Sequence, residues 1–167
     1  MLIIFGGLPG VGKTTIAEEL ARQIGAMHLR IDSIEQAIRD CGKLTGPLDE
    51  LGYRVAYAVA KDNLLLGRTV VADSVNPLLV TREAWTDVAS GAGVGKLEIE
   101  FTCSDRKLHR QRLEARLSDI AGLRVTWEEV ISREYEPWNR EHIVIDTAAT
   151  SVADAVNQLR KHLKERA

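Results

Sequence analysis

The sequence predicts an α/β fold in which a parallel sheet carries helices on both of its faces. Short apolar segments alternate with helical patterns about five times along the chain, which is typical of strand–helix–strand units. The first apolar segment shows no polar alternation, as expected for a strand that is buried on both faces. The chain has 167 residues, so we expect one domain over residues 1–167, because a single core usually holds roughly 100–200 residues.

The elements follow from hydrophobic spacing and from turn residues. The first strand is expected at 2–5 and the first helix at 14–24, where apolar residues recur every three or four positions and Gly25 is a natural stop. A capping-box spacing at Thr126 and Glu129 predicts a helix that Pro137 ends. Further strands are expected at 27–31, 69–72, 97–102 and 143–145, and further helices at 33–39, 50–66, 81–89, 104–117 and 151–164.

Composition narrows the class of protein. Lys and Arg total 22 against 24 Asp and Glu, a net charge of −2, so a protein that acts mainly on nucleic-acid phosphates is disfavoured. The two cysteines, Cys41 and Cys103, lie far apart and suggest reduced thiols in a cytoplasmic protein. No segment approaches the ~20 apolar residues of a membrane span, so no membrane association is expected.

A glycine-rich motif follows the first strand and fits the phosphate-binding pattern GxxxxGK[ST]. Glycines let backbone N–H groups crowd around phosphate oxygens, and the positive end of the following helix dipole points at the same anion. Lys13 is expected to contact the β and γ phosphates, and the Thr14 hydroxyl to bind Mg²⁺. The expected nucleotide-binding residues are Gly7, Leu8, Pro9, Gly10, Val11, Gly12, Lys13, Thr14 and Thr15.

Two aspartates close predicted strands, and the carboxyl ends of the strands are where ligands bind in open α/β sheets. Asp73 is a candidate Mg²⁺ ligand through a water molecule, with a helix cap or turn as the alternative. Asp32 is a candidate general base for an attacking hydroxyl, and it could instead cap the helix expected to begin near Ser33, or do both. Asp32 and Asp73 should both face the phosphate-binding loop.

The basic helix expected at 104–117 is the third candidate for a part of the site. Arg112 and Arg116 are four residues apart and therefore share a helix face. An arginine pair can stabilise the negative charge that spreads over a transferring phosphoryl group. The alternative is a solvated basic face. The histidines have no metal-ligand spacing, and the tryptophans are scattered, so both are expected to be structural.

These motifs resemble the small P-loop kinases, the nucleoside-monophosphate-kinase-like group that also holds zeta-toxin-like kinases, polynucleotide kinases, gluconate kinases and chloramphenicol phosphotransferase. The resemblance spans nearly the whole chain and is most specific at GLPGVGKTT. It implies a three-layer P-loop NTPase fold with a five-stranded parallel sheet in the order 2-3-1-4-5. It also implies ATP and Mg²⁺ as cofactors and a monomer or homodimer.

The same resemblance assigns roles to particular positions. RIDSIEQAI looks like the acidic motif of the second strand and RTVVADSVNP like that of the third. RQRLEAR looks like an arginine-bearing lid, here around 112–126, in which Arg112 would also contact the nucleotide. IDTAATS occupies the adenine-side loop, which would place Thr147 and Ala148 near the base.

The function these features favour is an ATP-dependent phosphotransferase acting on a hydroxyl of a small molecule, with Lys13, Asp32, Arg112 and Arg116 as catalytic residues. A nucleic-acid 5′-hydroxyl kinase is one alternative, but Glu35 stands where polynucleotide kinases have a phosphate-reading arginine. An ATP-binding switch or ATPase that acts through a protein partner is another. The acceptor is expected between 33–60 and the lid, with weak candidates Tyr53, Arg54 and Tyr57.

Overall fold

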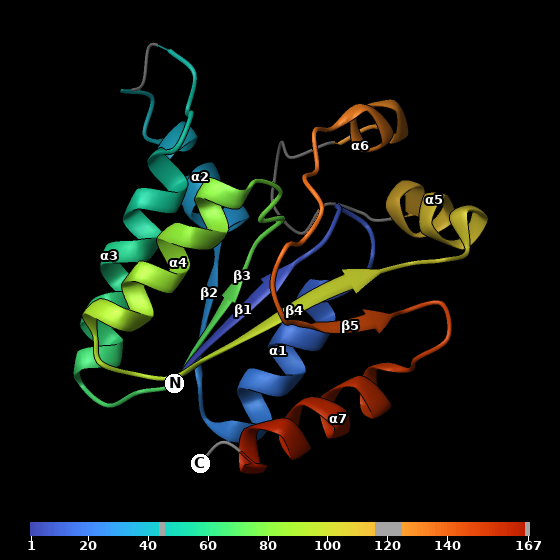
Figure 1. Cartoon of the computed structure of the whole chain (residues 1–167). Helices are drawn as coiled ribbons and strands as arrows, with labels where there is room; N and C mark the ends of the chain where they lie inside the picture. The colour runs from blue at the N-terminus through green and yellow to red at the C-terminus, as the bar shows by residue number, and fades with distance from the viewer. Residues whose placement is uncertain (44–45, 116–124, 166–167) are drawn as a thin grey trace.

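The computed structural model describes residues 1–43, 46–115 and 125–165, which form three layers (Figure 1). Within these residues, five parallel strands make one sheet in the order β2-β3-β1-β4-β5, and this confirms the predicted fold class and strand order. The strands are β1 (Leu2–Gly6), β2 (Met27–Arg30), β3 (Val70–Asp73), β4 (Lys96–Thr102) and β5 (Ile143–Asp146).

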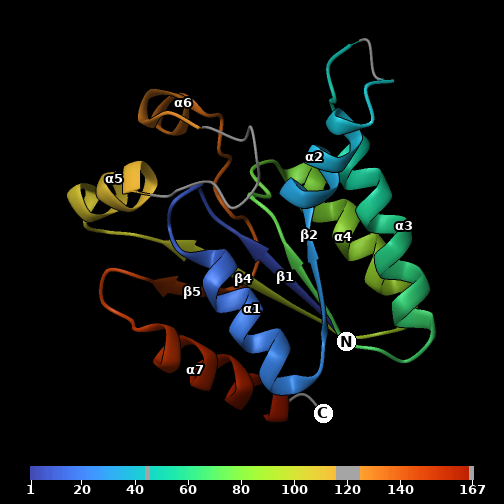
Figure 2. The ribbon, with the colours of Figure 1, turned by 180° about the vertical axis from the view of Figure 1, so that it is seen from behind.

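Helices cover both faces of the sheet. Successive side chains of the central strand β1 point to opposite faces, so this strand contributes to the core on each side. Ile3 and Phe5 pack with α1 (Lys13–Ile24) and α7 (Val152–Glu165) in one core. Leu2 and Ile4 pack with α3 (Leu51–Leu65) and α4 (Leu79–Gly91) in the other. Figures 1 and 2 show the two helix pairs on opposite sides of the sheet. The first strand therefore reads as a continuous apolar run, as predicted.

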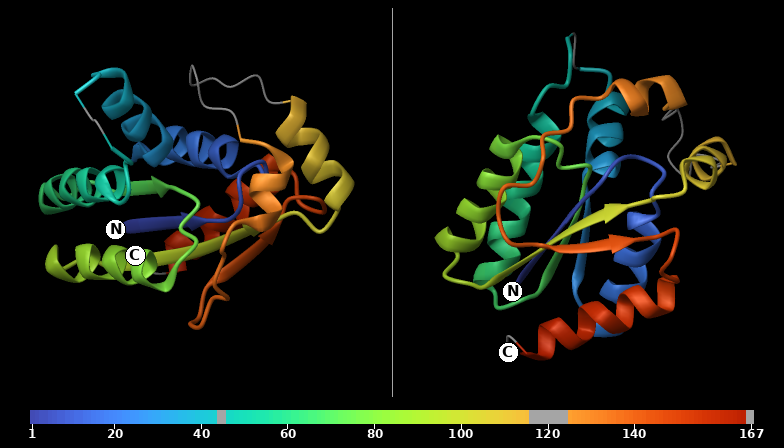
Figure 3. Two further views of the ribbon diagram at one scale, coloured as in Figure 1. Left: turned by 90° about the horizontal axis from the view of Figure 1, so that it is seen from above. Right: turned by 45° about the vertical axis from the view of Figure 1, so that its right-hand side comes forward.

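Three further helices lie beyond the carboxyl ends of the strands (Figure 3). They are α2 (Ile31–Asp40), α5 (Arg106–Ala115) and α6 (Trp127–Ser132). The helices α5 and α6 pack together through Leu113, Trp127 and Val130. In the described part of the chain, no helix is both long and apolar enough to cross a membrane.

Several predicted helix boundaries are off by two or more residues, and two of them bear on the site. The capping box at Thr126 and Glu129 forms as predicted, but α6 ends at Ser132 rather than near Pro137. The following segment is held instead by the buried Arg82, whose guanidinium donates to the carbonyls of Glu136 and Pro137. Tertiary hydrogen bonds here replace the helical ones that the local pattern predicted.

The helix α2 begins at Ile31, two residues earlier than predicted. Asp32 therefore lies in the first helical turn and not at the cap position, which is taken by Arg30 without a side-chain cap hydrogen bond. The alternative reading of Asp32 as the helix N-cap is wrong. A carboxylate in the first turn still interacts favourably with the positive end of the helix dipole.

Candidate active site

The loop between β1 and α1 has the backbone shape that its glycines predict. Gly7, Gly10 and Gly12 have φ values of +137°, +86° and +97°, which L side chains rarely adopt. A Cβ atom on Gly7 would lie 2.4 Å from the Phe101 carbonyl oxygen. The Gly7 N–H donates to the Val75 carbonyl at 2.9 Å, so the start of this loop is fixed to the segment after β3. Backbone N–H groups at the start of α1 can therefore receive an anion.

Lys13, Thr14 and Asp73 come together at the edge of the sheet. Lys13 is 7% exposed and its Nζ donates to the Leu8 carbonyl at 3.3 Å, which folds the side chain back over the loop. Asp73 pairs with Phe5 across the β1–β3 register and is 3% exposed. Burial acts to raise the pKa of Asp73, but hydrogen bonds from His28 and Thr14 and the charge of Lys13 hold that pKa below its usual range. Asp73 is therefore an ionised carboxylate at neutral pH.

This arrangement fits Mg²⁺. The hydroxyl of Thr14 and the carboxylate of Asp73 are hard oxygen donors within hydrogen-bonding reach of each other. The described residues hold no cluster of three or more His, Cys, Asp or Glu side chains for a metal ion. Mg²⁺ commonly needs only one or two protein oxygens, because water and nucleotide phosphates supply the rest. Thr14 and Asp73 therefore lie close enough to contribute oxygens to one metal ion.

His28 is a neighbour that sequence reasoning missed. Its Nε2 lies 3.3 Å from Asp73 Oδ2, from a strand that pairs in parallel with β3. The sequence carries a signal for this contact only once the strand order is known, because β2 and β3 must first be adjacent. The His28 ring can therefore fix the orientation of the Asp73 carboxylate through this contact.

A cavity of about 600 Å³ lies against the loop and α1. It brings together Gly10, Gly12, Lys13, Thr14, Thr15, Arg112, Thr147, Thr150 and Ser151. Ala148 does not line this cavity, and its backbone N–H binds Asp146 in its own loop at 3.0 Å. The cavity volume lies within the range of pockets that hold nucleotide-sized ligands.

Arg112 reaches this cavity through Thr147. Its Nη1 donates to Thr147 Oγ1 at 3.0 Å and its Nη2 to the Thr147 carbonyl at 3.2 Å. The Thr147 hydroxyl lies 2.7 Å from the Val11 carbonyl, so it can donate to the phosphate-binding loop itself. Thr147 thus braces both the loop and the arginine, a role that its predicted position near the base did not include.

The basic helix α5 is not simply a solvated face. His109 is buried, and a nitrogen of its ring lies 2.8 Å from the Pro9 carbonyl, so α5 rests on the loop. Arg110 pairs with Glu114 at 2.7 Å on the outer side, whereas Arg112 lines the cavity. Arg116 lies outside the described residues, as does most of the lid predicted around 112–126.

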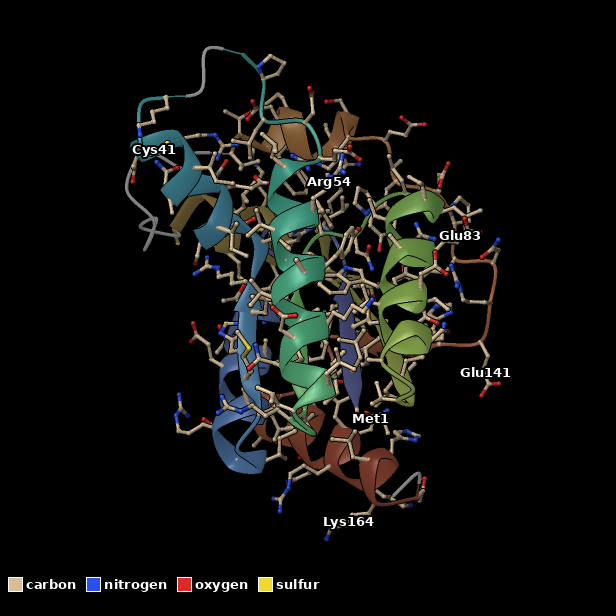
Figure 4. The ribbon with its side chains drawn as sticks, turned by 90° about the vertical axis from the view of Figure 1, so that its left-hand side faces the viewer. Met1, Cys41, Arg54, Glu83, Glu141 and Lys164 are labelled. Atoms are coloured by element: carbon tan, nitrogen blue, oxygen red, sulfur yellow. The ribbon has the colours of Figure 1, made fainter. Side chains whose placement is uncertain are left out.

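A second cavity, of about 410 Å³, lies between α2, α3, α4 and the segment after α6. Asp32 lines it, together with Tyr53 and Tyr57, the two expected acceptor-side tyrosines. Val75 lines it as well, and the bond from Gly7 to the Val75 carbonyl joins this cavity to the start of the loop. Arg54 does not line it: it pairs with Glu50 at 3.1 Å on the exposed end of α3 (Figure 4).

The fold and site together define a P-loop NTPase domain with a second cavity lined by Asp32. The family model described as the AAA domain matches residues 2–132, and the chain belongs to that family. A shikimate kinase of Corynebacterium efficiens is 32% identical over 112 residues, covering 60% of this chain and 66% of the relative. An uncharacterized protein of Mycobacterium tuberculosis is 29% identical over 88% of this chain. The chain spans about a third (32%) of that relative's length.

Solved structures share the fold across nearly the whole chain. Kti12 of Chaetomium thermophilum in complex with ADP-AlF3 has a TM-score of 0.71 and 23% identity, covering 99% of this chain and 98% of the other. The APS kinase CysC of Mycobacterium tuberculosis in complex with AMPPNP and APS has a TM-score of 0.67 and 17% identity, covering 98% and 96%. At these identities the likeness concerns the fold.

Proposed function

We propose that this domain is an ATP- and Mg²⁺-dependent kinase that transfers the γ-phosphoryl group to a hydroxyl of a small molecule. The observation that carries the proposal is a pair of cavities, one lined by the phosphate-binding loop and one lined by Asp32 and by Val75, whose carbonyl accepts from the Gly7 N–H. A phosphotransferase needs two such spaces, because it must hold a nucleotide and an acceptor at once. The similarity to a shikimate kinase supports the same class of reaction.

The residues divide the work by position. Loop N–H groups and Lys13 bind the phosphates, while Thr14 and Asp73 hold Mg²⁺. The bound Mg²⁺ would neutralise charge on the phosphate oxygens. Arg112 faces the same cavity from α5, where its guanidinium can stabilise the charge that develops during transfer. Arg116 is proposed for the same role from its spacing alone.

Asp32 is proposed to accept the proton of the acceptor hydroxyl. Its side chain is 34% exposed and lines the second cavity, so a bound acceptor can reach it. Arg30 Nη2 lies 4.0 Å from Asp32 Oδ2 and can help to orient the carboxylate toward a bound hydroxyl. The hydroxyl oxygen then attacks the γ-phosphorus as the bond to the β-phosphate oxygen breaks and ADP leaves.

The test is a phosphoryl-transfer screen with ATP, Mg²⁺ and pooled hydroxyl compounds, including sugars, sugar acids, nucleosides and 5′-hydroxyl oligonucleotides, with products identified by mass. A small-molecule product that Lys13→Ala abolishes, and that the exposed Lys161→Ala retains, supports the proposal. Product from oligonucleotides alone would favour a nucleic-acid kinase. Nucleotide binding without any product would favour a switch that acts through a protein partner.

Asp32→Asn tests the proposed base. It should lower kcat by at least ~100-fold and change ATP affinity little, because general base catalysis typically contributes ~10²–10⁴-fold. Asp40→Asn is the matched control, since Asp40 is exposed at the other end of the same helix, where it binds Gln36. Equal losses of kcat and of ATP affinity in Asp32→Asn would make Asp32 a structural residue.

A further inference from the structure

The second cavity has an acidic wall. Four carboxylates line it, Asp32, Glu35, Asp49 and Glu50, and Arg133 is the one cationic side chain among its described lining residues. Glu35 and Glu50 pair with arginines at 3.5 Å and 3.1 Å, but those arginines are 43% and 70% exposed and do not line the cavity. Exposed ion pairs of this kind contribute little and are screened by salt. Arg30, whose side chain is 9% exposed, lies 4.0 Å from Asp32, so together with Arg133 two cations stand against four carboxylates and an excess of negative charge remains.

Glu35 packs against α3 at Gly52, a position that has no side chain. A Cβ atom on Gly52 would lie 2.4 Å from Glu35 Cγ, so only glycine lets α3 approach α2 this closely without moving Glu35. Burial acts most strongly on this carboxyl and, with the negative charge of Asp32, raises the pKa of Glu35 above its usual value despite Arg39 and Arg133. A positive charge bound beside Glu35 would offset that repulsion.

The aromatic side of the cavity suits a cation as well. The Tyr53 and Tyr57 ring centroids lie 6.0 Å apart. The Tyr53 hydroxyl accepts a hydrogen bond from the Asn76 N–H at 3.0 Å, and the Tyr57 hydroxyl donates to the Thr81 carbonyl at 3.3 Å. These bonds fix both rings, and burial raises the pKa of Tyr53 to about 12, so its phenol is neutral. Neutral aromatic faces attract ammonium groups.

Asn76 adds unused hydrogen-bonding capacity next to this wall. Its side chain is completely buried, and among the described residues neither Oδ1 nor Nδ2 has a hydrogen-bond partner. Its chain neighbours Val75 and Pro77 both line the cavity. A buried amide without partners is unfavourable, and its polar atoms usually indicate a ligand or ordered water.

We propose that the acceptor is a hydroxyl compound that also carries a protonated amine, such as an amino sugar or an aminocyclitol. This rests on the proposed kinase function. The ammonium group lies between the Glu35 carboxylate and the Tyr53 and Tyr57 rings and is not consumed. The hydroxyl faces Asp32, loses its proton to that carboxylate, and forms the new bond to the γ-phosphorus as ADP departs. Acceptors that carry phosphate or carboxylate groups are repelled by the same wall.

The experiment compares acceptors of similar framework that carry an ammonium, a neutral or an acidic group. The probes are glucosamine with N-acetylglucosamine and glucuronate, serinol with N-acetylserinol and glycerate, and kanamycin with its fully N-acetylated derivative. Binding is measured by calorimetry with AMPPNP present, and transfer by mass with ATP. At least one amine should bind tenfold or more tightly than its acetylated partner, as expected for a charged hydrogen bond. Binding of no amine, or a preference for acetylated or acidic partners, overturns the proposal.

Glu35→Gln should weaken binding of that amine about tenfold, and Gly52→Ala should act in the same direction by displacing Glu35. Glu83→Gln is the matched control, because Glu83 is exposed on α4 outside the cavity (Figure 4). Unchanged amine affinity in both test variants overturns the proposal. Tight amine binding without any product would refute the kinase function but still support a cation-binding site in this cavity. Product from neutral or acidic acceptors alone would support the kinase function but refute an amine-bearing acceptor.

Discussion

Thr147→Val isolates the hydroxyl that joins the phosphate-binding loop to Arg112. A threonine hydroxyl has one proton, and the Val11 carbonyl at 2.7 Å is nearer than the Thr102 carbonyl at 3.0 Å. The proton therefore goes to Val11, and the oxygen accepts from Arg112 Nη1 at 3.0 Å. Valine keeps the branched shape and the backbone bond from the residue 147 N–H to the Thr102 carbonyl at 2.9 Å. The substitution thus removes two hydrogen bonds and little volume.

The cost can be worked from these two bonds. Loss of the partner of a buried carbonyl costs about 1–3 kcal/mol, and the arginine bond adds less because a partly exposed guanidinium can bind water. We expect a loss of roughly 2 kcal/mol in the free energy of unfolding, or about 4–8 °C in Tm for a domain of this size. Arg112 keeps its bond to the Thr147 carbonyl, so ATP affinity should fall only about threefold to tenfold.

Urea unfolding followed by circular dichroism gives the stability change, and calorimetry with AMPPNP gives the affinity. Thr69→Val is the matched control, because Thr69 lies before β3 and lines neither of the two cavities at the loop. If Thr147→Val changes the unfolding free energy and the nucleotide affinity no more than Thr69→Val does, the hydroxyl does not brace the loop. The assignment of Thr147 as a link between the loop and Arg112 would then be wrong.

Three other substitutions test separate parts of the site. Gly7→Ala should abolish AMPPNP binding in calorimetry, because its Cβ would meet the Phe101 carbonyl at 2.4 Å; normal binding would contradict the close approach. Asp73→Asn should flatten the acid side of a pH series of urea midpoints. The folded pKa of Asp73 lies below its unfolded value, so its stabilisation is complete above about pH 4 and is lost as pH falls through the folded pKa. Arg82→Met should lower the unfolding free energy by about 3 kcal/mol or more, unlike exposed Arg68→Met, because Arg82 binds four carbonyls.

Much of the sheet and the nucleotide side could be predicted because the signals there are local. The strand β1 must be apolar on both faces, and the loop after it needs glycines where φ is positive, so both features appear as contiguous patterns. Asp73 could be located for the same reason, since it is the last residue of a buried strand. These residues are specified by their neighbours in sequence.

The remaining contacts depend on residues that only the tertiary structure brings together. The end of α6 was predicted from Pro137, but Arg82, more than fifty positions earlier in the chain, fixes that segment. The start of α2 was predicted two residues too late. Nothing in the sequence around Asp32 distinguishes the last strand residue from the first helical one. His28, Thr147 and His109 act through partners that no spacing rule connects to them.

The two cavities therefore respond differently to sequence change. The nucleotide side is formed largely by one contiguous loop and its helix, so a substitution there alters phosphate binding directly. The second cavity takes its walls from α2, α3, the residues after β3 and the segment that Arg82 holds in place. Changes at Glu35, Gly52 or Arg133 can alter the charge of this wall without touching the loop. If the proposed function holds, acceptor preference can diverge among relatives that share the loop, because the acceptor would be recognised by this wall and not by the loop.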